Sequence, residues 1–192
     1  MKAILISIKP KWYVEIMNGD KTIEVRKNKA LYKAIQKLID ENGYADIYVY
    51  CSKGKLGLYD NRNHITCASD IFFLDKLGYD KPPLLNGKVI FKFRCYKVDE
   101  WDIWQEDLEE KLKFACLSIK EFDDYSKGQI AYAIHINDLE IFDKPKELSE
   151  FKHYKKFSEI DYMLPIPRKE TCERLVALTK APQSWCYVEE PK

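Results

Sequence analysis

The sequence has little net charge, little arginine and no long apolar run. Its 32 Lys and Arg and 31 Asp and Glu leave a formal net charge of +1. That balance argues against a surface coated with positive charge for nucleic acid, but it leaves a local basic patch open. No apolar stretch approaches the length of a membrane span, and the short apolar run at residues 3–8 lacks the cleavage region of a signal peptide. We therefore expect a cytoplasmic protein without a membrane partner.

The six cysteines show neither disulfide nor zinc spacing. No two of them form a C-x-x-C pair, and no cysteine–histidine cluster has the spacing of a zinc site. A disulfide-built secreted domain is therefore a poor interpretation, and we expect reduced, mostly buried thiols. The sequence points to no metal and no cofactor.

Residues 7–26 compress a strand, a short helix, a turn and a polar strand into one stretch. Pro10 suits a first helical position, where a backbone N–H has no partner in any case. Gly19 suits a helix end, because glycine enters the left-handed region freely. After the turn, alternate residues share one face of a strand: Thr22, Glu24 and Arg26. This polar face is either a solvated surface or the floor of a site.

The rest of the chain, which shows no internal repeat, predicts further helices and strands. Helices are expected at 30–42, at 105–114 and from Ser118, which forms a capping box with Glu121. Further strands are expected at 46–51, 88–101, 129–136, 139–142 and 184–189. The longest of these strands is expected to point four side chains inward: Val89, Phe91, Phe93 and Cys95. Residues 152–181 are Lys-rich with scattered prolines and are expected to form an insertion with one helix.

This order of elements favours an α+β fold with a mixed, mainly antiparallel sheet that closes into a small β-barrel. The first and last strands are both short and apolar. In a closed barrel they can pair with each other and remove the open edges of the sheet.

Several polar groups have both a structural and a functional interpretation. On the polar strand, Lys21 and Arg26 can neutralise phosphate while Glu24 orients a ligand or accepts a proton. Lys9, which ends the neighbouring strand, can reach the same region. Two other features are weaker candidates, because a solvated sheet face or a hydrogen-bonded histidine explains them equally well: the stripe of Lys92, Arg94 and Tyr96, and His135.

With these residues laid out, the chain resembles the ASCH-domain proteins, a branch of the PUA-like superfamily. The resemblance rests on S-I-K-P at residues 7–10 followed by residues 19–26, which fit the signature G-x-K-x-x-E-x-R. Further support comes from residues 47–53, 86–90, 132–139, 143–146 and 182–188. The resemblance implies one PUA-like domain over residues 1–192, a small β-barrel with flanking helices. Relative to a minimal domain, it implies insertions at about 30–43, 65–80 and 152–181.

The resemblance also implies a cleft beside the first helix that binds RNA, another single-stranded nucleic acid or a modified nucleotide. In that cleft Trp12 or Trp185 would stack on a base. The residues expected to bind nucleic acid are Lys9, Trp12, Lys21, Thr22, Glu24, Arg26, Ser52, Lys53 and Trp185.

Two alternatives remain open at this point. Some relatives are amidohydrolases acting on acylated cytidine and others are described as ribonucleases, so Lys21 and Glu24 are candidate catalytic residues. The amidohydrolase nucleophile is a threonine three residues after the lysine, where this chain has Glu24, and a carboxylate cannot perform the same acyl chemistry. The second alternative is a protein partner bound through residues 65–80 or 152–181.

Overall fold

The computed structural model describes residues 2–53, 58–60, 65–67, 84–161 and 168–189. The helices are α1 (Pro10–Met17), α2 (Lys29–Asn42), α4 (Leu108–Lys113), α5 (Ile119–Ser126) and the 3-10 turn η1 (Leu148–Glu150). The first six strands are β1 (Lys2–Ile8), β2 (Ile23–Arg26), β3 (Ala45–Cys51), β4 (Leu58–Asp60), β5 (Ile65–Cys67) and β6 (Val89–Cys95). The others are β7 (Val98–Trp101), β8 (Ala131–His135), β9 (Asn137–Lys146), β10 (Lys152–Asp161), β11 (Arg168–Ala177) and β12 (Trp185–Glu189). No helix in these ranges is long and apolar enough to cross a membrane.

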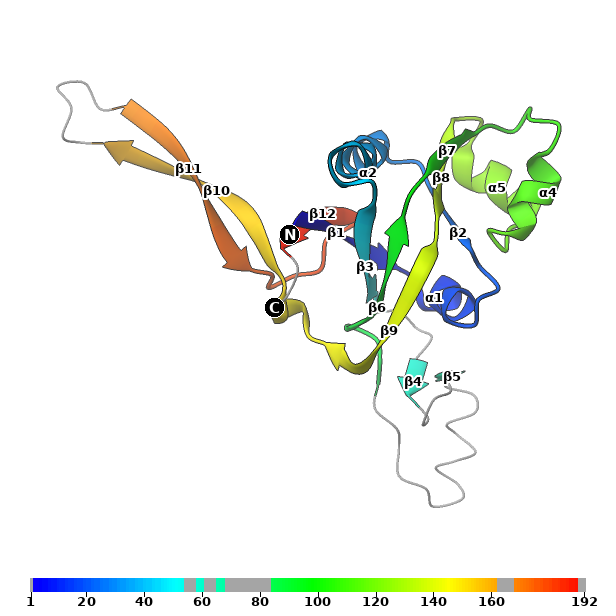
Figure 1. Ribbon diagram of the computed structural model, residues 1–192, viewed down its shortest axis with the longest axis horizontal. Coiled ribbons are helices and arrows are strands. Elements are labelled where there is room, and N and C mark those ends of the chain that lie inside the picture. Colours follow the sequence, from blue (N-terminus) through cyan, green and yellow to red (C-terminus); the bar gives the residue numbers. More distant parts are fainter. Residues whose placement is uncertain (1, 54–57, 61–64, 68–83, 162–167, 190–192) are drawn as a thin grey trace, which may run out of the picture.

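The strands form one large sheet and two smaller ones (Figure 1). The large sheet has seven strands in the order β11-β10-β12-β1-β3-β6-β9, and a three-stranded sheet has the order β2-β8-β7. Among the described pairs, β1 and β3 run parallel and the others are antiparallel. The prediction of a mixed, mainly antiparallel α+β fold is therefore confirmed. The first and last strands also pair, with Ile4 opposite Tyr187.

The described strands do not close into a barrel. The single strand expected at 88–101 divides at Tyr96 and Lys97, so that β6 stays in the large sheet and β7 joins the smaller one. At the other side, β12 is not an edge, because β10 and β11 extend the sheet beyond it. The sheet therefore ends in open edges instead of closing on itself.

One further prediction about an element is wrong, and another is right but too short. The described part of residues 152–181 holds no helix but an antiparallel hairpin, β10–β11, which extends away from the rest of the molecule (Figure 1). The strand expected at 139–142 continues as β9 through Pro145, pairing with β6 across irregularities in register. The prediction of one domain with three insertions stays a prediction, and residues 68–80 lie outside the described ranges.

The large sheet is buried on both faces around β1. Ile4, Ile6 and Ile8 enter the main core with α1 and α2, whereas Ala3 and Leu5 face a second cluster with Phe151 and Val188. A strand buried on both sides must be apolar throughout, which explains the unbroken apolar run at the start of the chain. A separate hydrophobic cluster, which includes Trp101 and Phe122, packs α4 and α5 against the three-stranded sheet.

A hydroxyl from α1 accounts for a bulge in the large sheet. Val49 lies opposite Phe91 but Tyr50 lies opposite Val89, so Ile90 is an extra residue in β6. The Ile90 N–H donates to the buried Tyr13 hydroxyl at 3.0 Å, and that hydroxyl donates to the Val49 carbonyl at 3.1 Å. The bulge turns Val89 into the opposite core from Phe91, so the prediction that both point to the same side is wrong.

The helix ends agree with the capping chemistry of the sequence. Ser118 and Glu121 form the predicted capping box at the start of α5. At α2, the Asn28 side chain accepts from the Leu31 N–H and Gly43 adopts a left-handed conformation with φ 83°. These caps define both ends of α2 and the start of α5.

Replacement of Tyr13 by phenylalanine tests the bulge. Tyr13→Phe leaves the Ile90 N–H and the Val49 carbonyl buried without their partner, so the free energy of unfolding should fall by about 1–3 kcal/mol in a urea titration. Tyr32→Phe is the control, because the Tyr32 ring stacks on Tyr132 with or without its hydroxyl. It should change the free energy of unfolding by less than about 0.5 kcal/mol. Equal values for the two variants would contradict this explanation.

Candidate functional site

A pocket of about 570 Å³ lies where α1, β2 and α5 come together. This volume falls within the range of about 300–1,000 Å³ that is typical of small-ligand sites. The residues that line it come from β1, α1, β2, α5 and the segments that flank them. They are Ser7, Ile8, Lys9, Trp12, Lys21, Glu24, Val25, Arg26, Ser52, Leu117, Glu121, Asp124, Tyr125 and Gln183.

The polar floor of the pocket is a buried carboxylate between two cations. The Lys21 Nζ lies 3.4 Å from Glu24 Oε2, and the Arg26 Nε lies 2.8 Å from Glu24 Oε1. Lys21 is only 3% exposed and Glu24 only 6% exposed. Buried charges of this kind are found only when paired, because desolvation of an isolated charge is costly. The polar face of β2 is therefore a buried wall rather than a solvated surface.

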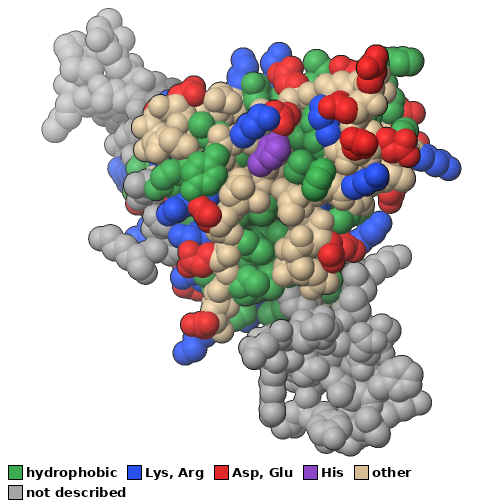
Figure 2. Space-filling model, turned by 45° about the vertical axis from the view of Figure 1, so that its right-hand side comes forward, with side chains coloured by type: hydrophobic (Ala, Val, Ile, Leu, Met, Phe, Trp, Pro, Cys, Tyr) green, Lys and Arg blue, Asp and Glu red, His purple; other side chains and the backbone are tan. Residues whose placement is uncertain are grey.

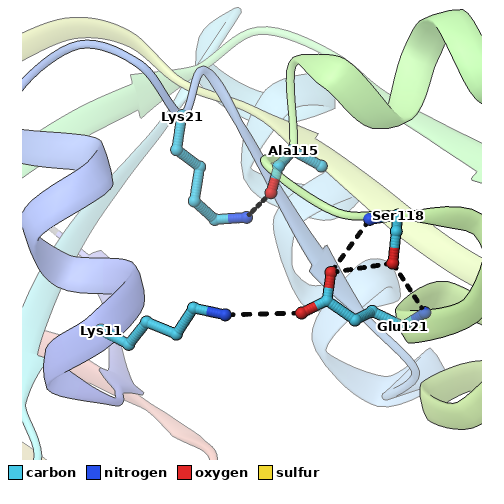
Figure 3. Close-up of polar contacts among 5 residues, drawn as sticks. All are labelled: Lys11, Lys21, Ala115, Ser118 and Glu121. Carbon is cyan, nitrogen blue, oxygen red and sulfur yellow. Dashed lines mark hydrogen bonds and ion pairs between the residues drawn. The ribbon is translucent and has the colours of Figure 1, made fainter.

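Backbone carbonyls hold the two cations in place. Lys21 Nζ donates to the Ala115 carbonyl at 2.8 Å (Figure 3), and the Arg26 Nη2 donates to the Ser7 carbonyl at 2.8 Å. The Arg26 Nε is buried, and its contact with Glu24 Oε1 is an ion pair. The floor thus joins β1, β2 and the segment before α5.

The rim of the pocket adds aromatic rings and two further carboxylates. Trp12 from α1 lies 5.2 Å from the Lys21 Nζ, measured to the ring centroid. Tyr125, Glu121 and Asp124 come from α5. Burial raises the pKa of the Tyr125 hydroxyl despite the opposing effect of Arg26, so this group stays neutral. The charged lining residues balance in sign: Lys9, Lys21 and Arg26 against Glu24, Glu121 and Asp124.

The structure brings six of the residues expected to bind nucleic acid to one pocket. They are Lys9, Trp12, Lys21, Glu24, Arg26 and Ser52. The pocket lining does not include Thr22, Lys53 or Trp185. Thr22 is exposed and its backbone N–H donates to Phe114, Lys53 is exposed near Gly87, and Trp185 packs its ring against Tyr187.

Several lining residues were not expected from the sequence. Ser7 and Gln183 belong to segments that carried the resemblance, but nothing in the sequence marks their side chains. Glu121, Asp124 and Tyr125 lie on α5. The capping box locates the start of that helix, but local sequence does not say which other element the helix faces.

The two weaker candidates lie elsewhere and have acidic partners. Lys92 lies 3.4 Å from Glu140, and Arg94 lies 3.3 Å from Asp46. His135 Nε2 lies 2.8 Å from Asp99 Oδ2. Burial raises the pKa of Asp99, but hydrogen bonds from Lys97 and His135 hold it below its ordinary value. These contacts account for the residues as local ion pairs.

Neither a metal cluster nor a reactive thiol is evident in the described part of the chain. No group of three or more His, Cys, Asp or Glu residues there is arranged to hold a metal ion. Burial raises the pKa of Cys51 to about 12 and the pKa values of Cys95 and Cys186 to about 11. These thiols are therefore protonated at neutral pH.

The comparisons with known proteins identify the fold. No family model matches the chain, and no curated protein matches it. A crystal structure of a single-residue variant of the ASCH protein from Zymomonas mobilis aligns with a TM-score of 0.51 and 16% identity, over 98% of this chain and 89% of that one. Another ASCH structure from Zymomonas mobilis aligns with a TM-score of 0.45 and 18% identity, over 76% and 73%. The N-terminal domain of Staphylothermus marinus McrB aligns with 0.42 and 10%, over 76% of each chain.

The fold and the pocket define an α+β protein with a polar cleft beside its first helix. Its fold is that of the ASCH domain proteins, a conclusion that rests on the structure with the TM-score of 0.51. The fold class expected from the resemblance is therefore confirmed, apart from the closure of the barrel.

Replacement of the floor carboxylate should be costly to the fold. Glu24→Gln leaves the buried Lys21 and the half-buried Arg26 without the charge that lies between them, so we expect the free energy of unfolding to fall by about 3 kcal/mol. Chemical denaturation of the purified variant measures this loss. Glu41→Gln removes a carboxylate from a well-exposed pair with Lys37 and should cost less than about 1 kcal/mol. If both variants lose equally little, the floor is not a stabilising unit.

Proposed function

We propose that the pocket binds one nucleotide unit of a single-stranded RNA. The resemblance to the ASCH-domain proteins implies nucleic-acid binding, and the polar pocket beside α1 supports that function on this chain. The observation that carries the proposal is the Lys21–Glu24–Arg26 floor of the pocket beside the Trp12 ring. Sequence-dependent RNA recognition uses bases that leave the stack, lie on aromatic rings and hydrogen-bond through their edges.

The floor suits the edge of a base better than a run of phosphates. Glu24 and Arg26 both line the pocket, so a carboxylate acceptor and a guanidinium donor lie side by side there. A nucleobase edge offers donors and acceptors side by side, so it can meet both groups at once. The pocket volume and the aromatic rim are suited to one base, with Trp12 as the stacking surface.

The charge distribution limits how much phosphate the site takes. Carboxylates on the floor and rim balance the cations of the pocket, and Figure 2 shows basic and acidic side chains interspersed over the face in view. A long single-strand track requires a continuous positive groove. We therefore propose local recognition of one base, with Lys9 contacting an adjacent phosphate.

The alternative is a hydrolase acting on acylated nucleosides or RNA with Lys21 and Glu24 as an acid–base pair. The two groups are close enough for that role. However, the hydroxyl of Ser7, on the neighbouring strand β1, donates to the Pro182 carbonyl instead of to a base. A nucleophilic mechanism needs its hydroxyl paired with a base, so we propose binding rather than turnover.

RNA binding should depend on Lys9 and on salt. The wild type should bind a short single-stranded RNA in fluorescence anisotropy, with an affinity that falls as salt rises. Lys9→Ala removes one exposed phosphate contact, so it should weaken binding and reduce the slope of log affinity against log salt by about 0.7. Because Lys9 is exposed, this variant keeps the fold.

Lys37→Ala serves as the matched control, since Lys37 is an exposed lysine on α2 paired with Glu41. It should leave the affinity and the salt slope unchanged. No RNA binding by the wild type at low salt, or equal effects of the two lysine variants, would refute the proposed site.

Turnover assays separate binding from catalysis. Acylated cytidine and single-stranded RNA, each incubated with excess wild-type protein and followed by chromatography, should remain intact because the Ser7 hydroxyl is bonded to a carbonyl and not to a base. Hydrolysis of either substrate that disappears in Glu24→Gln, measured on variant shown to be folded by circular dichroism, would instead support the enzyme.

A further inference from the structure

An ion pair bridges the two helices at the mouth of the pocket. Lys11 on α1 points across to Glu121 on α5, with 3.4 Å between Nζ and Oε1 (Figure 3). Glu121 lines the pocket, and so does Trp12, whose ring centroid lies 4.2 Å from the Lys11 Nζ. The ammonium group therefore lies at the edge of the pocket, although Lys11 is not one of the residues that line it.

The two partners differ in how firmly they are held. Glu121 Oε2 accepts from the Ser118 N–H and from the Ser118 hydroxyl, each at 3.0 Å (Figure 3). The hydrogen bond from the Ser118 N–H, with further contributions from the Ser118 hydroxyl and Lys11, lowers the pKa of Glu121, so this carboxylate is ionised at neutral pH. Lys11 has a long flexible side chain, 60% exposed, and no second hydrogen-bond partner among the described residues.

An exchange of partners at Lys11 is physically easy. Exposed ion pairs contribute little to stability, so separation of Lys11 from Glu121 costs little. After separation, Glu121 keeps both contacts with Ser118 and remains satisfied. A phosphate oxygen, in turn, forms a charge-assisted hydrogen bond with an ammonium group.

We propose that Lys11 is a phosphate-binding residue of this site, which Glu121 holds at the pocket mouth until a phosphate of the bound RNA displaces the carboxylate. The inference rests on the proposed function, since it names a contact to the same ligand. It adds a residue that neither the signature motif nor the pocket lining includes. It also gives the acidic rim a role: the carboxylate competes with phosphate for the lysine.

A double-mutant cycle tests the proposal with the full-length protein and a single-stranded oligouridylate of about ten nucleotides. Lys11→Ala should weaken binding about fivefold and reduce the salt slope by about 0.7, the value of one phosphate contact. Glu121→Gln should strengthen binding about threefold, because Lys11 no longer has to leave a carboxylate. Glutamine is accepted at this position of a capping box, so α5 should stay intact. In the double variant the gain from Glu121→Gln should disappear.

Asp123→Asn is the matched control on the same helix, because Asp123 is exposed and absent from the pocket lining. Asp123→Asn should change the RNA affinity by the same factor in the wild type and in the Lys11→Ala variant, because it acts only through the overall charge of the protein. A gain from Glu121→Gln that persists in the Lys11→Ala background, or no gain at all, would overturn the proposal. If the wild type binds RNA through Lys9 but the cycle is additive, only this inference fails; if the wild type binds no RNA, the proposed function fails with it.

Discussion

The buried carboxylate of Glu24 is the constraint on which the site depends. It lies between Lys21 and Arg26, and both cations need backbone carbonyls from other segments, Ala115 and Ser7. Loss of the central charge would leave the buried Lys21 and the half-buried Arg26 without a compensating charge. The same contacts position β2 against β1 and against the segment that leads into α5, and so they shape the pocket that these elements enclose.

Local sequence predicted those features whose cause is local. Alternation along β2 placed Glu24 and Arg26 on one face, and Pro10, Gly19 and the Ser118–Glu121 box marked helix ends because capping depends on adjacent residues. The apolar character of β1 indicated a strand. Its pairing with β12 was predicted only by analogy with a closed barrel, in which the first and last strands pair and leave no open edge. The resemblance supplied what periodicity alone did not, namely that the polar face of β2 borders a cleft.

The features that were missed depend on contacts between distant segments. The division of residues 88–101 into β6 and β7 places them in different sheets, and alternation looks the same on both sides of the break. The bulge at Ile90 exists because the Tyr13 hydroxyl reaches it from another element. Likewise, α5 lines the pocket because it packs on the three-stranded sheet, and no local sequence pattern encodes that packing.

The central claim is that nucleic acid enters this pocket, and the indole N–H signals of the tryptophans test it most directly. Of Trp12, Trp101, Trp104 and Trp185, the pocket lining includes Trp12, whereas Trp101 is buried and Trp104 is 87% exposed. In a heteronuclear NMR titration of nitrogen-15-labelled protein with single-stranded RNA, the Trp12 signal should shift first and most. A titration that shifts Trp104 or Trp185 and leaves Trp12 unchanged would contradict the account.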